Sequence, residues 1–212
     1  MIDSTIPRAL KVVGFTTGTW ALFVVIAASI TYYLGHPDFS IFRTYLSDVG
    51  DSSGWPQIIF NSGTLIAAPM RYLIVVLVAL QLYRLGADRS FVVLVLFIGL
   101  LSCSGTVFMT AIPFSLAPSI HKTGIVLYFI GTILLQTLIF LKEWSLKNIP
   151  KVLPVLSLLI VLVFFVFALL LFLYEQEVVS RSTPVIWEWM CFFISIVWVF
   201  IHSILLGKEA PR

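Results

Sequence analysis

Three residues of this chain carry side chains that together can activate water: Asp48, His121 and Glu188. A carboxylate and an imidazole can act as general base and general acid, and their oxygen and nitrogen atoms can also hold a divalent ion such as zinc. The three residues are far apart in the sequence, so this chemistry requires a fold that brings them together. They are our candidate catalytic residues and, if a metal takes part, our candidate metal ligands.

The elements that must position these residues are membrane helices. The chain has 212 residues, of which 60% are hydrophobic and 11% are charged, and its mean hydropathy is +1.07. A spanning helix needs about 20 apolar residues, and six runs meet this requirement: 12–34, 58–82, 90–112, 121–141, 152–174 and 185–206. The sequence therefore predicts an all-α, multi-pass membrane protein, with one six-transmembrane-helix bundle over residues 1–212.

Basic residues predict the orientation of this bundle, because cytoplasmic loops of membrane proteins are rich in lysine and arginine. One side of the bundle would carry Arg8, Lys11, Arg84, Arg89, Lys142, Lys147, Lys151, Lys208 and Arg212, and the other Arg43, Lys122 and Arg181. We therefore expect both termini to be cytoplasmic and the protein to lie in the cell membrane. The loops at 35–57, 113–120 and 175–184 would then be extracytoplasmic, and Asp48, His121 and Glu188 would share one rim.

Several classes of function are disfavoured by the same features. The loops are too short for a separate soluble domain, and the chain lacks the common signatures of nucleotide, acyl-serine and zinc-protease sites. We expect neither nucleic acid nor a nucleotide as a partner. Cys103 and Cys191 lie inside predicted spans, where they are best explained as small packing residues. Function must therefore lie within the bundle or at its rims.

The second predicted span carries a polar face. Asn61, Thr64, Ala68 and Arg71 follow one another at intervals of three, four and three, so they share one side of a helix. Arg71 would lie near mid-membrane, where a charge is costly unless it is paired or hydrogen-bonded. Two interpretations stay open: a structural brace, which can use a carbonyl released by Pro69, or a functional anion ligand.

Other polar and small residues have simpler interpretations. Small residues let membrane helices approach closely, and we expect such contacts at Gly99, Ser102, Thr106, Gly124 and Gly131. Glu188 has two interpretations, a site residue or a hydrated side chain in an aromatic belt with Trp187 and Trp189. His202 follows Glu188 by 14 residues, which is about 21 Å along a helix, so it cannot join the rim.

Short motifs follow one another along the chain: LSDVG at 46–50 with the later Pro56, FNSG at 60–63, HKTG at 121–124 and the Glu188-Trp189 pair. In order and spacing they resemble the prokaryotic membrane proteins catalogued as domain of unknown function 998. More distantly, the pattern is similar to the FRAG/DRAM/SFK group, which includes the DRAM autophagy modulators, the yeast SFK proteins and the GPI-anchor lipid-remodelling proteins. The resemblance covers all six predicted spans and implies a six-helix fold and a lipid-related role.

Two hypotheses of function follow. The first is a non-enzymatic protein that binds a membrane lipid or a membrane partner in a polar pocket at the extracytoplasmic rim, where Arg43 or Lys122 would contact a phosphate. Its candidate binding residues are Arg43, Ser47, Asp51, Asn61, Arg71 and Lys122. The alternative is an intramembrane lipid hydrolase or transferase that uses Asp48, His121 and Glu188, with or without zinc.

A transporter is a weaker third hypothesis, because only one charged residue lies in mid-membrane and no pair of broken spans is apparent. Association into a homo-oligomer or with a membrane-protein partner stays open.

Overall fold

Helices account for the whole architecture of the part of the chain that the computed structural model describes, residues 5–112 and 114–208. They are α1 (Thr5–Gly35), α2 (Leu46–Asp51), α3 (Trp55–Arg84), α4 (Arg89–Ala111), α5 (Pro118–Ser145), α6 (Val152–Glu175) and α7 (Ser182–Leu206). Six of them, all except α2, are long and apolar enough to cross a membrane. The expected all-helical fold with six spans is therefore confirmed.

Local signals set where several helices begin. Asp88 is the N-cap of α4, and its Oδ1 accepts a hydrogen bond from the Phe91 amide at 2.8 Å. Pro56 and Pro118 lie in the first turns of α3 and α5, where the missing N–H removes no helical hydrogen bond. The largest difference from the predicted ranges is in α1, which begins at Thr5 instead of residue 12. Its helical conformation continues beyond the apolar run.

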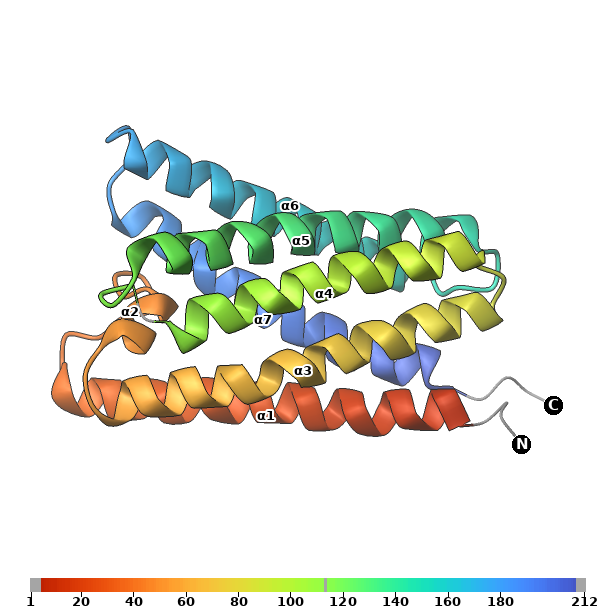
Figure 1. Cartoon of the computed structure of the whole chain (residues 1–212), viewed down its shortest axis with the longest axis horizontal. Helices are drawn as coiled ribbons and strands as arrows, with labels where there is room; N and C mark the ends of the chain where they lie inside the picture. Colours follow the sequence, from red (N-terminus) through yellow and green to blue (C-terminus); the bar gives the residue numbers. More distant parts are fainter. Residues whose placement is uncertain (1–4, 113, 209–212) are drawn as a thin grey trace.

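The six long helices form a closed ring. Each packs against the next long helix along the chain, and α1 also packs against α7. Figure 1 shows that α1 begins and α7 ends at the same end of the bundle, whereas α2 lies at the opposite end. The interior of the ring is therefore bounded by helices from both halves of the chain.

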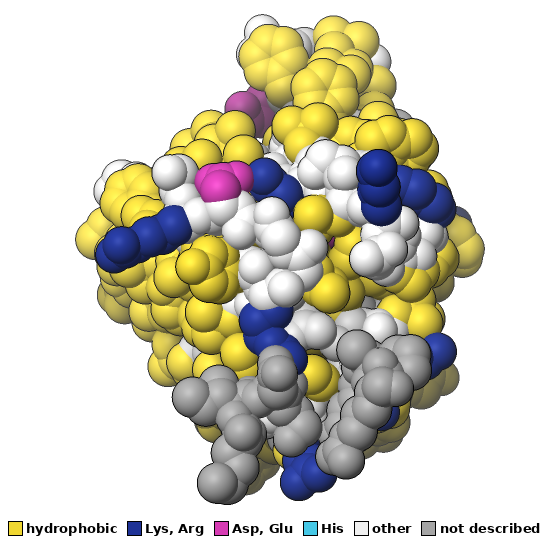
Figure 2. All heavy atoms as spheres, turned by 90° about the vertical axis from the view of Figure 1, so that its right-hand side faces the viewer, with side chains coloured by type: hydrophobic (Ala, Val, Ile, Leu, Met, Phe, Trp, Pro, Cys, Tyr) yellow, Lys and Arg dark blue, Asp and Glu magenta, His cyan; other side chains and the backbone are white. Residues whose placement is uncertain are grey.

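Basic side chains gather at the end where α1 begins and α7 ends (Figure 2). At this end Arg84 is the last residue of α3 and Arg89 the first of α4, and the connection between α5 and α6 contains Lys147 and Lys151. This distribution agrees with the predicted orientation, because positive residues favour the cytoplasmic side. The assignment of this end to the cytoplasm stays a prediction.

Glycines let α4 and α5 pack with their backbones in contact. A Cβ atom on Gly105 would collide with the backbone nitrogen of Tyr128, and one on Gly124 would lie 2.6 Å from the backbone nitrogen of Met109. Gly131 leaves room for Ser102 in the same way, since its added Cβ would lie 2.9 Å from the Ser102 Cβ. The close packing expected of the small residues in these two spans is therefore present.

A short helix, α2, lies in the segment 35–57, which was predicted to be a loop. The side chain of Asp48 caps the beginning of this helix, because its Oδ2 accepts a hydrogen bond from the Tyr45 amide at 2.9 Å. The helix packs on α1, α3 and α7 at the end of the ring. Asp48 therefore belongs to a helix and not to an irregular loop.

A buried polar network joins α5, α6 and α7 towards the basic end. Oε1 of Glu143 lies 2.9 Å from Nε2 of His202, and the hydroxyl of Ser157 donates to Oε2 of Glu143 at 3.1 Å. The indole of Trp198 donates to the Ser157 hydroxyl at 2.9 Å. Glu143 and His202 are both 0% exposed. Glu143 lies outside the predicted span at 121–141, so this partner of His202 was missed.

Candidate ligand-binding cavity

A cavity of about 460 Å³ lies inside the ring and reaches α2. Each of the helices α1 to α7 contributes residues to its lining. Ligand pockets usually measure roughly 300–1,000 Å³ and are mostly apolar with a few placed polar groups. The size and lining of this cavity are typical of such a pocket.

The lining differs from one side of the cavity to the other. α6 contributes only aromatic and aliphatic side chains, from Phe167, Leu171 and Tyr174. α3 and α4 contribute Asn61 at the rim and deeper polar groups from Thr64, Arg71, Thr106 and Thr110. The cavity therefore has the surface that a ligand with both a polar and an apolar part requires.

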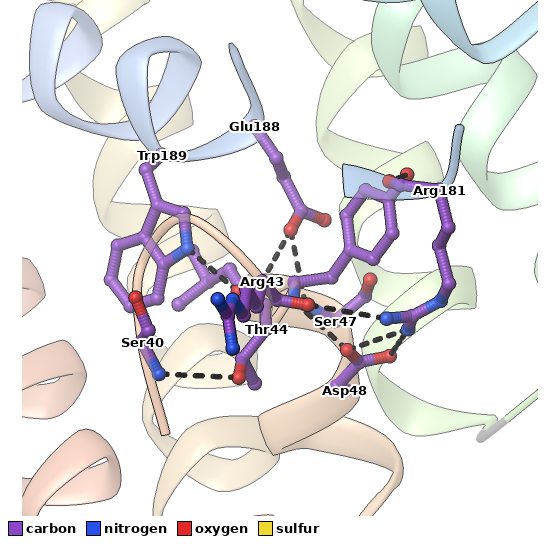
Figure 3. A network of polar contacts seen from close by, with 10 residues as sticks. Ser40, Arg43, Thr44, Ser47, Asp48, Arg181, Glu188 and Trp189 are labelled. Carbon is purple, nitrogen blue, oxygen red and sulfur yellow. Dashed lines mark hydrogen bonds and ion pairs between the residues drawn. The ribbon is translucent and has the colours of Figure 1, made fainter. Parts of the chain in front are cut away.

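Glu188 connects α7 to the beginning of α2. Its Oε2 accepts hydrogen bonds from the backbone N–H groups of Leu46 and Ser47, the second at 3.4 Å (Figure 3). The first N–H groups of a helix have no partner within the helix, so a carboxylate placed there satisfies them and interacts favourably with the helix dipole. Glu188 also lines the cavity. It therefore holds α2 in place over the cavity.

Asp48 is paired with Arg181, the residue just before α7. Nη2 of Arg181 donates to both carboxylate oxygens at 2.7 Å, and Nη1 donates to the carbonyl of Arg43 at 3.2 Å. This pairing raises the pKa of the Arg181 guanidinium. The guanidinium also lies over the ring of Tyr45, 4.8 Å from its centre, and burial raises the pKa of that phenol. The Asp48 carboxylate is thus occupied by a contact within the protein.

Further hydrogen bonds fix the segment around α2. The indole of Trp189 donates to the carbonyl of Thr44 at 3.0 Å, and Nδ2 of Asn61 donates to the carbonyl of Gly50 at 2.9 Å. Oδ1 of Asp51 accepts from the hydroxyl of Ser115 at 3.1 Å. α2 is therefore held by α3, by α7 and by the connection between α4 and α5.

His121 lies at the other side of the same rim. Its Nδ1 is 2.9 Å from the carbonyl oxygen of Ile112, and its ring meets that of Phe114 edge to face at 5.8 Å. His121, Asp48 and Glu188 all line the cavity, but each contacts a different partner. No three His, Cys, Asp or Glu side chains within residues 5–112 and 114–208 form a group that could hold a metal ion. The arrangement gives the zinc site no support, and a catalytic role of these residues stays a prediction.

Arg71 lies deeper in the cavity lining. Its Nη2 donates to the carbonyl of Ser102 at 3.1 Å and to the hydroxyl of Thr106 at 2.7 Å. Its guanidinium carbon lies 4.8 Å from the centre of the Tyr128 ring, which is a cation–π contact. The brace considered from the sequence is present, but it reaches α4 and α5 instead of the carbonyl that Pro69 releases in its own helix.

A known protein family matches the chain over nearly the whole of this helical bundle. Residues 9–206 match the Frag1/DRAM/Sfk1/Cwh43P N-terminal domain. The chain belongs to this family. The matched range includes α2, the cavity lining and nearly all of the six long helices.

Membership of the Frag1/DRAM/Sfk1/Cwh43P family confirms the resemblance to the FRAG/DRAM/SFK group. The narrower resemblance to domain of unknown function 998, and with it a prokaryotic origin, stays a prediction. No curated protein and no solved structure matches the chain.

Arg43 and Lys122 of this Frag1/DRAM/Sfk1/Cwh43P-family protein do not belong to the cavity lining. Both residues are exposed. The other candidate binding residues do line the cavity: Ser47, Asp51, Asn61 and Arg71. If Arg43 or Lys122 contacts a phosphate, it must do so outside the cavity.

Sequence reasoning missed two contributors to the site of this family member. Arg181 was assigned only as a basic loop residue, and no sequence spacing connects it to Asp48. Tyr128 was not among the candidate site residues, although its ring faces Arg71. The only available signal for Tyr128 was its place on one helical face with Gly124 and Gly131.

Proposed function

We propose that this Frag1/DRAM/Sfk1/Cwh43P-family protein binds one membrane lipid in the cavity beneath α2. It would do so as a multi-pass protein of the cell membrane with cytoplasmic termini. The cavity itself carries this proposal, because it joins polar groups at its rim and depth to an apolar wall from α6.

The location of the cavity supports binding from the extracytoplasmic leaflet. The cavity reaches α2, and α2 lies at the end of the bundle opposite the basic end (Figures 1 and 2). Under the positive-inside rule the basic end is cytoplasmic. A lipid of the outer leaflet would then enter the cavity past Ser47, Asp51 and Asn61.

Binding is favoured over hydrolysis by the contacts of the three candidate catalytic residues. Asp48 pairs with Arg181, Glu188 accepts backbone N–H groups of α2, and His121 contacts a backbone carbonyl. These contacts hold the protein's own segments together. A general base needs to reach the proton that it removes, and both Asp48 oxygens, Oε2 of Glu188 and Nδ1 of His121 are engaged by these contacts.

The experiment is to identify and count the lipid that remains with detergent-purified protein, by native mass spectrometry and lipid extraction. Ala67 lines the cavity, so Ala67→Phe should fill part of it. Ala111 is exposed and does not line the cavity, so Ala111→Phe is the matched control. We expect one lipid per chain in the wild-type protein and in the control, and a loss of lipid in Ala67→Phe.

Wild-type protein that retains no lipid, and takes up none from added bilayer lipids, would overturn the proposal. So would an Ala67→Phe variant that binds lipid as well as the control does.

A further inference from the structure

Arg71 is a positive charge in the cavity wall without an acidic partner in the described chain. Within residues 5–112 and 114–208, Lys142 forms an ion pair with Asp88 and Arg181 forms one with Asp48, while Glu143 is hydrogen-bonded to His202. The acidic groups of the rim are each engaged by other donors. The charge of Arg71 is therefore not neutralised by the described residues.

The hydrogen bonds of Arg71 use only one end of its guanidinium. All three leave from Nη2, and they reach the Ser102 carbonyl, the Ser102 hydroxyl and the Thr106 hydroxyl. A guanidinium carries five N–H donors in a planar fork that suits two oxygens of one anion. Arg71 is only partly buried, and it lines the cavity. Its remaining donors can thus reach a ligand there.

The surroundings of Arg71 hold its guanidinium in a fixed plane. Tyr128 lies against its face, and Thr106 holds Nη2 at 2.7 Å. A donor group that is already oriented loses little conformational entropy when an anion binds. Thr106 and Tyr128 are accordingly positioning residues for Arg71.

The depth of Arg71 argues against an acyl chain as its ligand. Arg71 follows the rim residue Asn61 by ten residues, which corresponds to about 15 Å along α3, or half of a hydrocarbon core of about 30 Å. An unneutralised cation at this depth is costly, and a low dielectric strengthens its attraction to an anion. A polar group of the ligand, and not the end of its chain, should therefore occupy this part of the cavity.

We propose that Arg71 is an anion subsite of the cavity and that the bound lipid carries an anionic oxygen group, a phosphate or a carboxylate, which Arg71 binds. This inference rests on the proposed lipid binding. It assigns the head group to a position below the rim, between the polar walls of α3 and α4 and the ring of Tyr128.

Two lipids with identical chains test the subsite: dioleoyl phosphatidic acid, which carries a phosphate, and dioleoylglycerol, which does not. Affinities are measured for both with purified protein by native mass spectrometry. Because hydrogen bonds to charged groups are among the strongest in proteins, we expect the wild-type protein to prefer phosphatidic acid by about tenfold or more. In Arg71→Met the ratio of the two affinities should fall to about one.

Control variants separate loss of the subsite from loss of the fold. Arg89 is exposed and is not part of this cavity, so Arg89→Met should keep the wild-type ratio. Arg71→Lys keeps the charge without the planar fork and should keep a reduced preference, which tests the inference even if Arg71→Met does not fold. Inorganic phosphate added in excess should not displace phosphatidic acid; displacement would identify a free anion as the ligand.

The outcomes distinguish the two proposals. If neither lipid binds, the proposed function fails. If both lipids bind wild-type protein equally, or if Arg71→Met and Arg71→Lys keep the full preference, lipid binding stands and the anion subsite is wrong.

Discussion

Arg181 and Asp48 are separated by 133 residues, yet Nη2 of Arg181 lies 2.7 Å from both oxygens of the Asp48 carboxylate. This ion pair joins the beginning of α7 to α2 at the end of the ring (Figure 3). Together with Glu188, which contacts the first N–H groups of α2, it makes the position of α2 dependent on α7. Access to the cavity from this end therefore depends on contacts between distant parts of the chain.

Removing the Arg181 pair should loosen α2. Arg181→Gln deletes the charge, and because a surface ion pair contributes up to about 1 kcal/mol, opening should become at most about fivefold more frequent. Cys191 lines the cavity and is buried, so its reaction rate with a water-soluble maleimide, measured in a Cys103→Ser background, reports this opening. Lys122→Gln, at an exposed position outside the cavity lining, is the control. An unchanged rate in Arg181→Gln would mean that other contacts hold α2.

Removing one partner of the Glu143–His202 pair should destabilise the bundle more than removing both. Leaving a buried polar group without its hydrogen-bond partner typically costs about 1–3 kcal/mol, whereas replacing both partners by apolar residues costs far less. Glu143→Leu should therefore lower the free energy of unfolding more than the double variant Glu143→Leu/His202→Leu does. Unfolding in mixed micelles measures both, with Glu175→Leu at an exposed helix end as the control. Equal losses in the single and double variants would contradict this expectation.

The contact between α4 and α5 should not tolerate a methyl group at Gly105. Its Cβ would meet the backbone nitrogen of Tyr128 and the carbonyl oxygen of Gly124, neither of which can move without moving α5. We expect Gly105→Ala to destabilise the protein by about 1–3 kcal/mol, as overpacking does. Gly35→Ala is the matched control, because an added Cβ there meets nothing within 4 Å. Thermal unfolding in detergent compares the two variants. Similar melting curves would show that α4 and α5 can move apart enough to accommodate the added methyl group.

The turn between α3 and α4 should lose stability at low pH. The Lys142 ammonium, which donates to Asp88 at 2.7 Å, and the Phe91 amide lower the pKa of that carboxyl from 3.8 to about 2. A depressed pKa stabilises the folded state above the unfolded value of 3.8, and this contribution is lost as the pH falls towards 2. Asp88→Asn keeps the N-cap but removes the charge. This variant should therefore be less stable than wild type near neutral pH, and the two stabilities should converge below the folded pKa of Asp88. Denaturant unfolding across this range measures the difference, and a constant difference would exclude the pairing as its cause.

The orientation of the bundle can be tested with single cysteines. Ser180 lies in the connection between α6 and α7 at the α2 end, and Lys147 lies between α5 and α6 at the basic end. In a chain without Cys103 and Cys191, an impermeant maleimide added to intact cells should label Ser180→Cys and spare Lys147→Cys until the membrane is permeabilised. The reverse pattern would place both termini outside the cytoplasm.

The six spans were predictable because a membrane imposes strict conditions on a helix. Backbone groups in lipid must be satisfied within the helix, and about 20 apolar residues are needed to cross. α2 was not predictable in this way. It has six residues, too few for a periodic pattern, and isolated helices of this length are unstable in water. Its formation depends on the Asp48 cap and on Glu188, which comes from a distant part of the chain.

The rim residues were predictable from topology and helix rise, whereas their partners were not. Asp48, His121 and Glu188 were placed at one rim from the topology of the spans, and all three do line one cavity. Rotation of each helix about its axis is set by packing, and spacing revealed it only for the polar face of α3, whose residues Asn61, Thr64, Ala68 and Arg71 all line the cavity. Glu143 illustrates this limit, since it follows the apolar run of α5 and resembles a loop residue, yet its carboxylate is completely buried.

The contact between α1 and α7 has a consequence for the biogenesis of the protein. α7 leaves the ribosome after the other membrane helices, and it alone completes the ring and supplies Glu188 and Trp189 to the α2 segment. Until α7 is inserted, the inner faces of α1 and α6 have no neighbour between them and are open to bilayer lipid. The cavity is therefore closed only once α7 has been inserted, and a lipid already lying between α1 and α6 would be enclosed when α7 arrives.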